Sequence, residues 1–185
     1  MVGKTVSAIN RLLLSLFMIA LVGSAQGTEN MALNSQSEAF IKQLATEIER
    51  ADRIVVTEHS NRFDTRDPNA DYVEVIYGTR VLDAAQKDAF LQATKALDPE
   101  TKNAYAGCIF VPHHSIYFYS NATLLSTLDV CFECGDIDWS IPAPPQPWAI
   151  ISGLSKLVSD LGFAPERDWK ALAQQAAATE QQTNK

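Results

Sequence analysis

Residues 108–119 read CIFVPHHSIYFY, residues 121–123 read NAT, and residues 124–133 read LLSTLDVCFE. Both longer runs are rich in β-branched and aromatic residues, which favour extended strands. The short polar run between them has the composition of a turn. Since two such strands joined by a short turn pair with each other, this part of the chain is predicted to be a β-hairpin, and the rest of the fold is organised around it.

The alternation of side chains along the hairpin predicts which face of each strand is buried. In the second strand the even-numbered side chains are mostly apolar, which is typical of a face that packs on a core. The odd-numbered side chains are more polar and are expected to face solvent: Thr127, Asp129, Cys131 and Glu133.

A three-residue loop between the strands matches the apolar faces and places residue i opposite residue 244 − i. This register puts Cys134 opposite Phe110, one diagonal step from Cys108, on the buried face. Cys131 then lies opposite His113 on the outer face. A two-residue loop would instead bring Cys131 to the face of Cys108 and His114.

The rest of the chain adds helices and a second hairpin. Strands are predicted at 53–58 and 72–77, and helices near 37–51, 83–98, 147–161 and 165–178, the second of them with Asp83 and Gln86 as a capping pair. The order α-β-β-α-β-β-α-α predicts an α+β domain, an antiparallel sheet of about four strands packed with four helices. Strands and helices do not alternate one by one and no glycine-rich phosphate loop is present, which argues against a parallel dinucleotide-binding fold.

The first 25 residues have the three parts of a secretory signal peptide. Lys4 and Arg11 are positive, residues 12–22 are apolar apart from Ser15, and small residues surround Ala25. The apolar run is about half the ~20 residues that span a bilayer, so we expect cleavage rather than anchoring. The mature protein is then expected to be exported and soluble, in the periplasm or secreted, with no transmembrane span. We predict a flexible N-terminus at 26–35, one domain at 36–178 and a disordered tail at 179–185.

The charge of the chain disfavours two classes of partner. The whole sequence carries a net charge of −7, and removal of Lys4 and Arg11 leaves 13 basic residues against 22 acidic ones, or −9. An acidic surface is repelled by nucleic acids and by anionic membranes. We therefore expect no nucleic-acid partner.

Cys108, Cys131 and Cys134 are the only cysteines, and several interpretations stay open. In an oxidising compartment a structural disulfide is favoured, with Cys108 bonded to Cys134 and Cys131 left over. A bridge between Cys131 and Cys134 requires that the strand ends at Cys131, because three extended steps separate Cα atoms by about 10 Å.

Two chemical alternatives use the same residues. In a zinc site, Cys131-x-x-Cys134 would supply half of the ligands, and Cys108 with His113 or His114 the other half. A second pair with zinc-ligand spacing is missing, so no cofactor is expected and zinc is kept as the alternative. Thiol–disulfide chemistry is the other alternative, although a catalytic C-x-x-C motif usually begins a helix, whereas this one ends a strand.

The runs Cys108 to Phe118 and Val130 to Cys134 resemble a pattern found in uncharacterised exported bacterial proteins. In that pattern a cysteine precedes a Pro-x-His-x-Ile strand, and a Cys-Phe-x-Cys strand follows. The matching residues are Cys108, Pro112, His114, Ile116, Cys131, Phe132 and Cys134. The resemblance brings no established activity, and it favours His114 over His113 as a partner of the cysteines.

Few other residues indicate chemistry. His59 follows a predicted strand and is interpreted as a solvated loop histidine, although a catalytic histidine can occupy such a position. Asp67, Asn69 and Asp71 imitate the start of a calcium loop, but Tyr72 stands where such a loop needs glycine. The sequence has neither a G-x-S-x-G nor an H-E-x-x-H motif, so no hydrolase class and no catalytic residue is indicated.

Aromatic residues predict an interaction surface. Trp139 and Trp148 flank a proline-rich segment and are expected on an exposed edge, and Tyr117 and Tyr119 lie on the outer face of the hairpin. The leading hypothesis is therefore a non-enzymatic binding or interaction domain with structural cysteines, for an unknown protein or small-molecule partner. The alternative is a metal-binding or thiol-redox protein.

Overall fold

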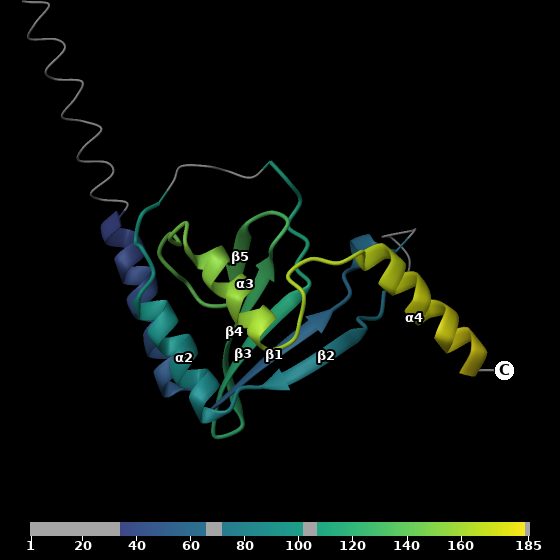
Figure 1. Ribbon diagram of the computed structural model, residues 1–185, viewed down its shortest axis with the longest axis horizontal. Coiled ribbons are helices and arrows are strands. Elements are labelled where there is room, and N and C mark those ends of the chain that lie inside the picture. Colours follow the sequence, from purple (N-terminus) through teal and green to yellow (C-terminus); the bar gives the residue numbers. More distant parts are fainter. Residues whose placement is uncertain (1–33, 66–71, 102–106, 184–185) are drawn as a thin grey trace, which may run out of the picture.

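The computed structural model describes residues 34–65, 72–101 and 107–183 (Figure 1). Within them the chain forms an antiparallel five-stranded sheet, in the order β2-β1-β3-β4-β5, together with helices. The predicted α+β class is therefore confirmed, with one strand more than expected. The predicted signal peptide, most of the predicted flexible N-terminus and the calcium-like segment lie outside the described residues.

The first hairpin pairs β1 (Arg53–His59) with β2 (Ile76–Val81), and a short 3-10 helix, η1 (Arg62–Asp64), lies in the connection. The second strand was predicted at 72–77 and begins four residues later. The reason lies at Ser60, whose side chain accepts the Val75 N–H at 2.9 Å and contacts the Tyr72 hydroxyl at 2.7 Å. These contacts replace strand pairing just before β2.

The second hairpin pairs β3 (His114–Ser120) with β4 (Thr123–Cys131), and the predicted register is confirmed for residues 114–118. The predicted three-residue loop is wrong, because the turn contains only Asn121 and Ala122, with φ angles of 48° and 65°. A β-bulge at Leu125 adds the residue that the shorter turn removes, so the register is preserved. Beyond the bulge the faces exchange, and Leu124, predicted on the apolar face, is 48% exposed.

The predicted first strand of this hairpin was too long at its start. Residues 108–113 do not belong to a strand, and β3 begins at His114. Pro112 has no N–H to donate to a neighbouring strand, which explains why regular pairing starts after it.

The fifth strand, β5 (Asp136–Trp139), was missed by the sequence analysis. It pairs with β4 from Leu128↔Trp139 to Cys131↔Asp136, and residues 132–135 form the loop between them. Gly135 ends this loop with a φ of +63°, a conformation that favours glycine.

Helices cover one face of the sheet. A helix at residues 34–50, here called the N-terminal helix, and α3 (Ile150–Asp160) supply apolar side chains to the core, and α2 (Ala84–Lys95) contacts α3. The Asp83–Gln86 capping pair that begins α2 is confirmed. The fully buried core side chains of β1, β3 and β4 are even-numbered: Ile54, Val56, Ile116, Phe118, Leu128 and Val130.

The last helix, α4 (Trp169–Thr183), lies apart from the other helices and contacts η1 (Figure 1). It begins four residues after Pro165, where the sequence placed its start, because the side chain of Asp168 accepts the N–H of Ala171. It continues to Thr183, through most of the segment predicted as a disordered tail. No helix in the described part of the chain is long and apolar enough to cross a membrane.

The turn between β3 and β4 predicts a stabilising substitution. Ala122 has a positive φ, which costs an alanine more than a glycine, so Ala122→Gly should raise the free energy of unfolding by about 0.5–1 kcal/mol. Urea unfolding measures it. Ala93→Gly, at an exposed position inside α2, is the matched control and should lower stability by a similar amount. A loss of stability in both variants would contradict the proposed turn geometry.

Candidate functional site

The three cysteines lie around the loop between β4 and β5. Cys108 and Cys134 are at disulfide distance, with Cα atoms 5.9 Å apart, which is the pairing that the hairpin register favours. Cys131 is free and 1% exposed, so the prediction that it faces solvent is wrong. It is buried where β5 pairs with β4, and the loop folds back so that the N–H of Cys134 donates to its sulfur.

The structure does not assemble the zinc ligands that the alternative hypothesis requires. The two adjacent histidines point to other partners: His113 contacts Asp64, and His114 packs against Phe132. No group of three or more histidine, cysteine, aspartate or glutamate side chains in the described part of the chain could hold a metal ion.

Sequence analysis missed a cluster of buried polar residues where β1 meets β3. All three histidines of the chain meet there, and the interpretation of His59 as a solvated loop residue is wrong, since it is buried at the end of β1. The cluster is defined by eight buried polar residues, here called the histidine cluster: Thr57, Glu58, His59, Ser60, Asp64, His113, His114 and Ser115. Burial of so many polar groups costs free energy unless they form hydrogen bonds or ion pairs with one another. Clusters of this kind are common at functional sites.

A chain of hydrogen bonds crosses three strands from this cluster. Nε2 of His59 is 2.9 Å from Oγ of Ser115, which is 2.5 Å from Oδ1 of Asp129 on β4. At the other side of the ring, Nδ1 is 2.9 Å from the carbonyl oxygen of Ser60 and 3.5 Å from the carboxylate of Glu74. The serine therefore lies between the histidine and the aspartate, unlike the nucleophile of a catalytic triad, which lies at one end.

The chemistry of the groups sets the direction of two hydrogen bonds in this chain. The Ser60 carbonyl can only accept, so Nδ1 of His59 carries a hydrogen. The Ser115 hydroxyl donates to Oδ1 of Asp129. Burial raises the pKa of Asp129, and the hydrogen bond donated by Ser115 opposes this effect by stabilising the carboxylate.

His113 connects the cluster to η1 and α4. Its Nε2 is 3.0 Å from the carboxylate of Asp64, and its ring stacks on Trp169 with centroids 4.2 Å apart. Asp64 also accepts the N–H of Asn61, within the capping box of η1. The start of α4 is thus held against the sheet by the stack of Trp169 on His113, whose ring is itself held by the buried contact with Asp64.

His114 and Glu58 are cross-strand partners on the core face. Within the described residues neither ring nitrogen of His114 has a hydrogen bond of good geometry. Burial lowers the pKa of His114 to about 3, so the ring is neutral at physiological pH. Glu58 is buried as well, and Nε of Arg167 lies 3.1 Å from its Oε1. Arg167, just before α4, is therefore the main counter-charge of a buried carboxylate.

A large groove lies between β5, the proline-rich segment 142–147 and α3. Its volume is about 970 Å3, and apolar and proline side chains form most of its walls, including Ile137, Ile141, Pro144, Pro145 and Ile151. Trp148 lines it and is 56% exposed. Among its described lining residues the only charged ones are acidic: Asp136, Asp138 and Glu166.

The predicted aromatic surface is only partly present. Trp148 is exposed, but Trp139 is 8% exposed and its ring packs edge-on against Phe40 of the N-terminal helix, so its predicted exposure is wrong. Pairing of β5 turns this tryptophan into the core. Tyr117 and Tyr119 are half-buried on the outer face of the sheet and stack on each other.

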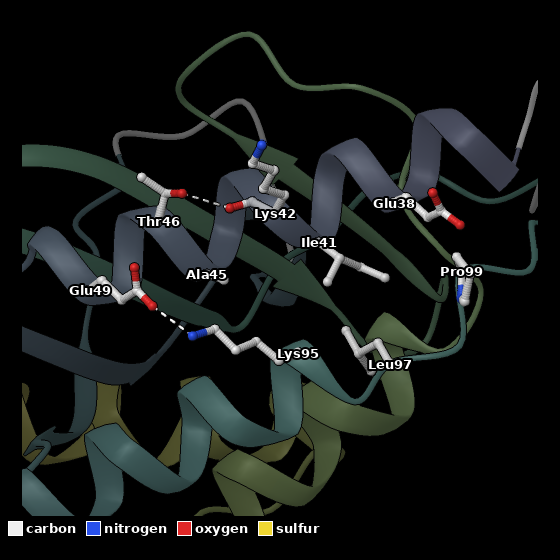
Figure 2. Close-up of a pocket in the computed structure, with 9 residues that line it drawn as sticks. All are labelled: Glu38, Ile41, Lys42, Ala45, Thr46, Glu49, Lys95, Leu97 and Pro99. Carbon is white, nitrogen blue, oxygen red and sulfur yellow. Dashed lines mark hydrogen bonds and ion pairs between the residues drawn. The ribbon is translucent and has the colours of Figure 1, made fainter.

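A second, smaller cavity of about 450 Å3 separates the N-terminal helix from the end of α2 (Figure 2). The ammonium group of Lys95 reaches across it to Glu49, 2.7 Å away, while Ile41 and Leu97 face each other further along. Since this ion pair joins the two walls of the cavity, we assign the cavity to the packing of the two helices rather than to ligand binding.

No protein-family model, curated protein or solved structure matches this chain. The resemblance of the hairpin to exported bacterial proteins therefore rests on the hairpin residues themselves.

The neutral state of His114 predicts acid sensitivity. An unfolded histidine titrates near pH 6.5, whereas folded His114 has its pKa lowered to about 3. The unfolded state therefore binds the proton first, and stability falls as the pH drops from about 6.5 towards 3, by at most about 1.4 kcal/mol per pH unit. His114→Phe should keep stability near neutral pH and reduce this slope. Urea unfolding of both proteins across this range tests it, and equal slopes would contradict the assignment.

The hydrogen-bond chain predicts different effects for two neighbouring hydroxyls. Ser115→Ala removes both contacts of the central hydroxyl and should destabilise the protein by about 2 kcal/mol. Thr57 is its cross-strand neighbour, and its buried Oγ1 has no partner in the described residues. Thr57→Val is therefore the matched control, expected to be neutral or stabilising. Similar losses in the two variants, measured by thermal unfolding, would argue against the chain.

Proposed function

We propose that this protein is an exported binding domain whose groove beside Trp148 holds a short basic and apolar segment of a polypeptide. The observation that carries the proposal is the composition of the groove: apolar walls, an exposed tryptophan and a set of charged lining residues that is entirely acidic. An apolar groove selects apolar side chains, and its carboxylates attract lysine or arginine side chains beside them.

The walls favour binding of a flexible segment. Proline residues at 142, 144, 145 and 147 restrict the backbone beside the groove, so little conformational entropy is lost there when a ligand binds. Tryptophan is among the residues that contribute most to protein interfaces, because its large ring buries much area with few rotatable bonds. The net charge, −9 once residues 1–25 are removed, adds a long-range attraction for a basic partner.

Export is part of the proposal. The signal-peptide pattern of residues 1–25 supports it, and a cysteine pair at disulfide distance is expected of a protein that works in an oxidising compartment. The absence of an assembled metal site among the described residues leaves the zinc alternative without support from the geometry.

The proposal predicts charge-selective peptide binding. A labelled peptide of alternating lysine and leucine should bind with an affinity in the micromolar range and weaken as salt increases, whereas its glutamate–leucine counterpart should not bind. Trp148→Ala should weaken binding by about tenfold or more, a loss typical of a tryptophan at the centre of an interface. Fluorescence anisotropy measures both effects.

Leu124→Ala provides the matched control. Leu124 of β4 is 48% exposed, close to the 56% of Trp148, but it does not line the groove, so its removal should leave binding unchanged. Equal binding of the two peptides, or equal losses in the Trp148 and Leu124 variants, would refute the proposed site.

A further inference from the structure

Cys134 contacts both of the other cysteines. Its sulfur is at bonding distance from the sulfur of Cys108, while its backbone N–H donates to the sulfur of Cys131, with the nitrogen and sulfur 3.3 Å apart. A free thiol therefore lies directly beside an existing disulfide. This is the arrangement from which thiol–disulfide exchange begins, because a thiolate attacks one of the two bonded sulfurs.

The loop between β4 and β5 brings the free thiol within reach. Strand β4 ends at Cys131, and residues 132–135 turn back to β5, with the N–H of Gly135 donating to the carbonyl of Phe132 at 3.1 Å. The sulfur of Cys131 lies 3.3 Å from the backbone nitrogen of Cys134, so the two residues approach closely, whereas three extended steps in a strand would separate their Cα atoms by about 10 Å. Such proximity is what a disulfide, with Cα atoms about 4.4–6.8 Å apart, requires of its two cysteines.

The three cysteines differ in exposure, so the exchange would move the free thiol from the interior to the surface. Cys131 is buried, whereas Cys108 is exposed and belongs to a segment, residues 107–113, that is not part of a strand. Release of Cys108 therefore breaks no sheet pairing. The N–H that Cys134 donates to the Cys131 sulfur holds this sulfur beside Cys134.

We propose that Cys131 transfers its thiol to the protein surface by disulfide exchange, so that Cys108 becomes a site of thiol modification. Cys131 first gives its proton to water, and its thiolate sulfur attacks the sulfur of Cys134. The Cys131–Cys134 bond forms as the Cys108–Cys134 bond breaks, and the electron pair leaves on Cys108, which then takes up a proton. One disulfide is lost and one is gained, so the step needs neither oxidant nor reductant.

The exposed Cys108 thiolate can then be alkylated by small electrophiles. It can also attack a low-molecular-weight disulfide, which leaves a mixed disulfide on Cys108 and releases the other half of the reagent as a thiolate. This inference does not depend on the ligand of the groove, although Cys134 lines it. Peptide binding and thiol transfer can therefore fail independently.

The position of a label on the native protein tests the proposal. Wild-type protein, oxidised and folded, is treated with N-ethylmaleimide at about pH 8, where thiolates are present, then acidified, digested and analysed by mass spectrometry. We expect the label on Cys108, together with a disulfide between Cys131 and Cys134. A label on Cys131 with Cys108 still bonded to Cys134, or no label, would overturn the proposal.

Two controls separate exchange from simple exposure. Cys131→Ser removes the attacking sulfur with little change in size, so Cys108 labelling should fall at least about tenfold, and circular dichroism checks that this variant is folded. In the second control, wild-type protein is unfolded in acid and labelled briefly with a reagent that reacts with thiols at low pH. Exchange is slow where thiolates are scarce, so this label shows which cysteine was free before exchange. Labelling of Cys108 at an unchanged rate in Cys131→Ser would also overturn the proposal. If that variant does not fold, the wild-type map alone decides.

Discussion

The pairing of β1 with β3 is the contact on which the rest of the structure depends. It joins residues as distant in sequence as Glu58 and His114, and it turns two separate hairpins into one sheet. It also sets which face of each strand is buried. Because side chains alternate along a strand, Glu58 and His114 lie on the same face of the sheet as the even-numbered core residues. This face is therefore apolar at its centre and carries ionisable side chains at its edge.

That edge stays folded because neighbouring elements supply the polar and charged partners that water would otherwise provide to Glu58 and the histidines. Arg167 lies against the carboxylate of Glu58, and Trp169 stacks on His113 while contacting His114 edge-on. These partners come from residues 167 and 169, just before and at the start of α4, and Trp169 also stacks on Tyr77 of β2. Since an unpaired buried charge costs several kcal/mol, the ion pair of Arg167 and the ring contacts of Trp169 both tie the start of α4 to the sheet.

The sequence predicted local features better than non-local ones. The 244 − i register followed from the two-residue period of the hairpin, and even a wrong loop length did not spoil it, because a bulge compensated. The histidine cluster was missed because His59 becomes buried only through pairing with β3, which no pattern near residue 59 reveals. Strand β5 was missed because four residues, Asp-Ile-Asp-Trp, are too few for a period, and Trp139 was therefore expected at the surface.

The missed strand connects the two proposed sites, the groove and the cysteine loop. Its pairing with β4 buries Trp139, forms one wall of the groove and closes the loop that carries Cys134. Under the proposed exchange, a change in the bonding of Cys134 would alter the end of the groove while the strand pairing beneath it, from Leu128↔Trp139 to Cys131↔Asp136, is retained. The proposed redox site and the proposed binding site are thus adjacent in this fold, and the element between them is a strand only four residues long.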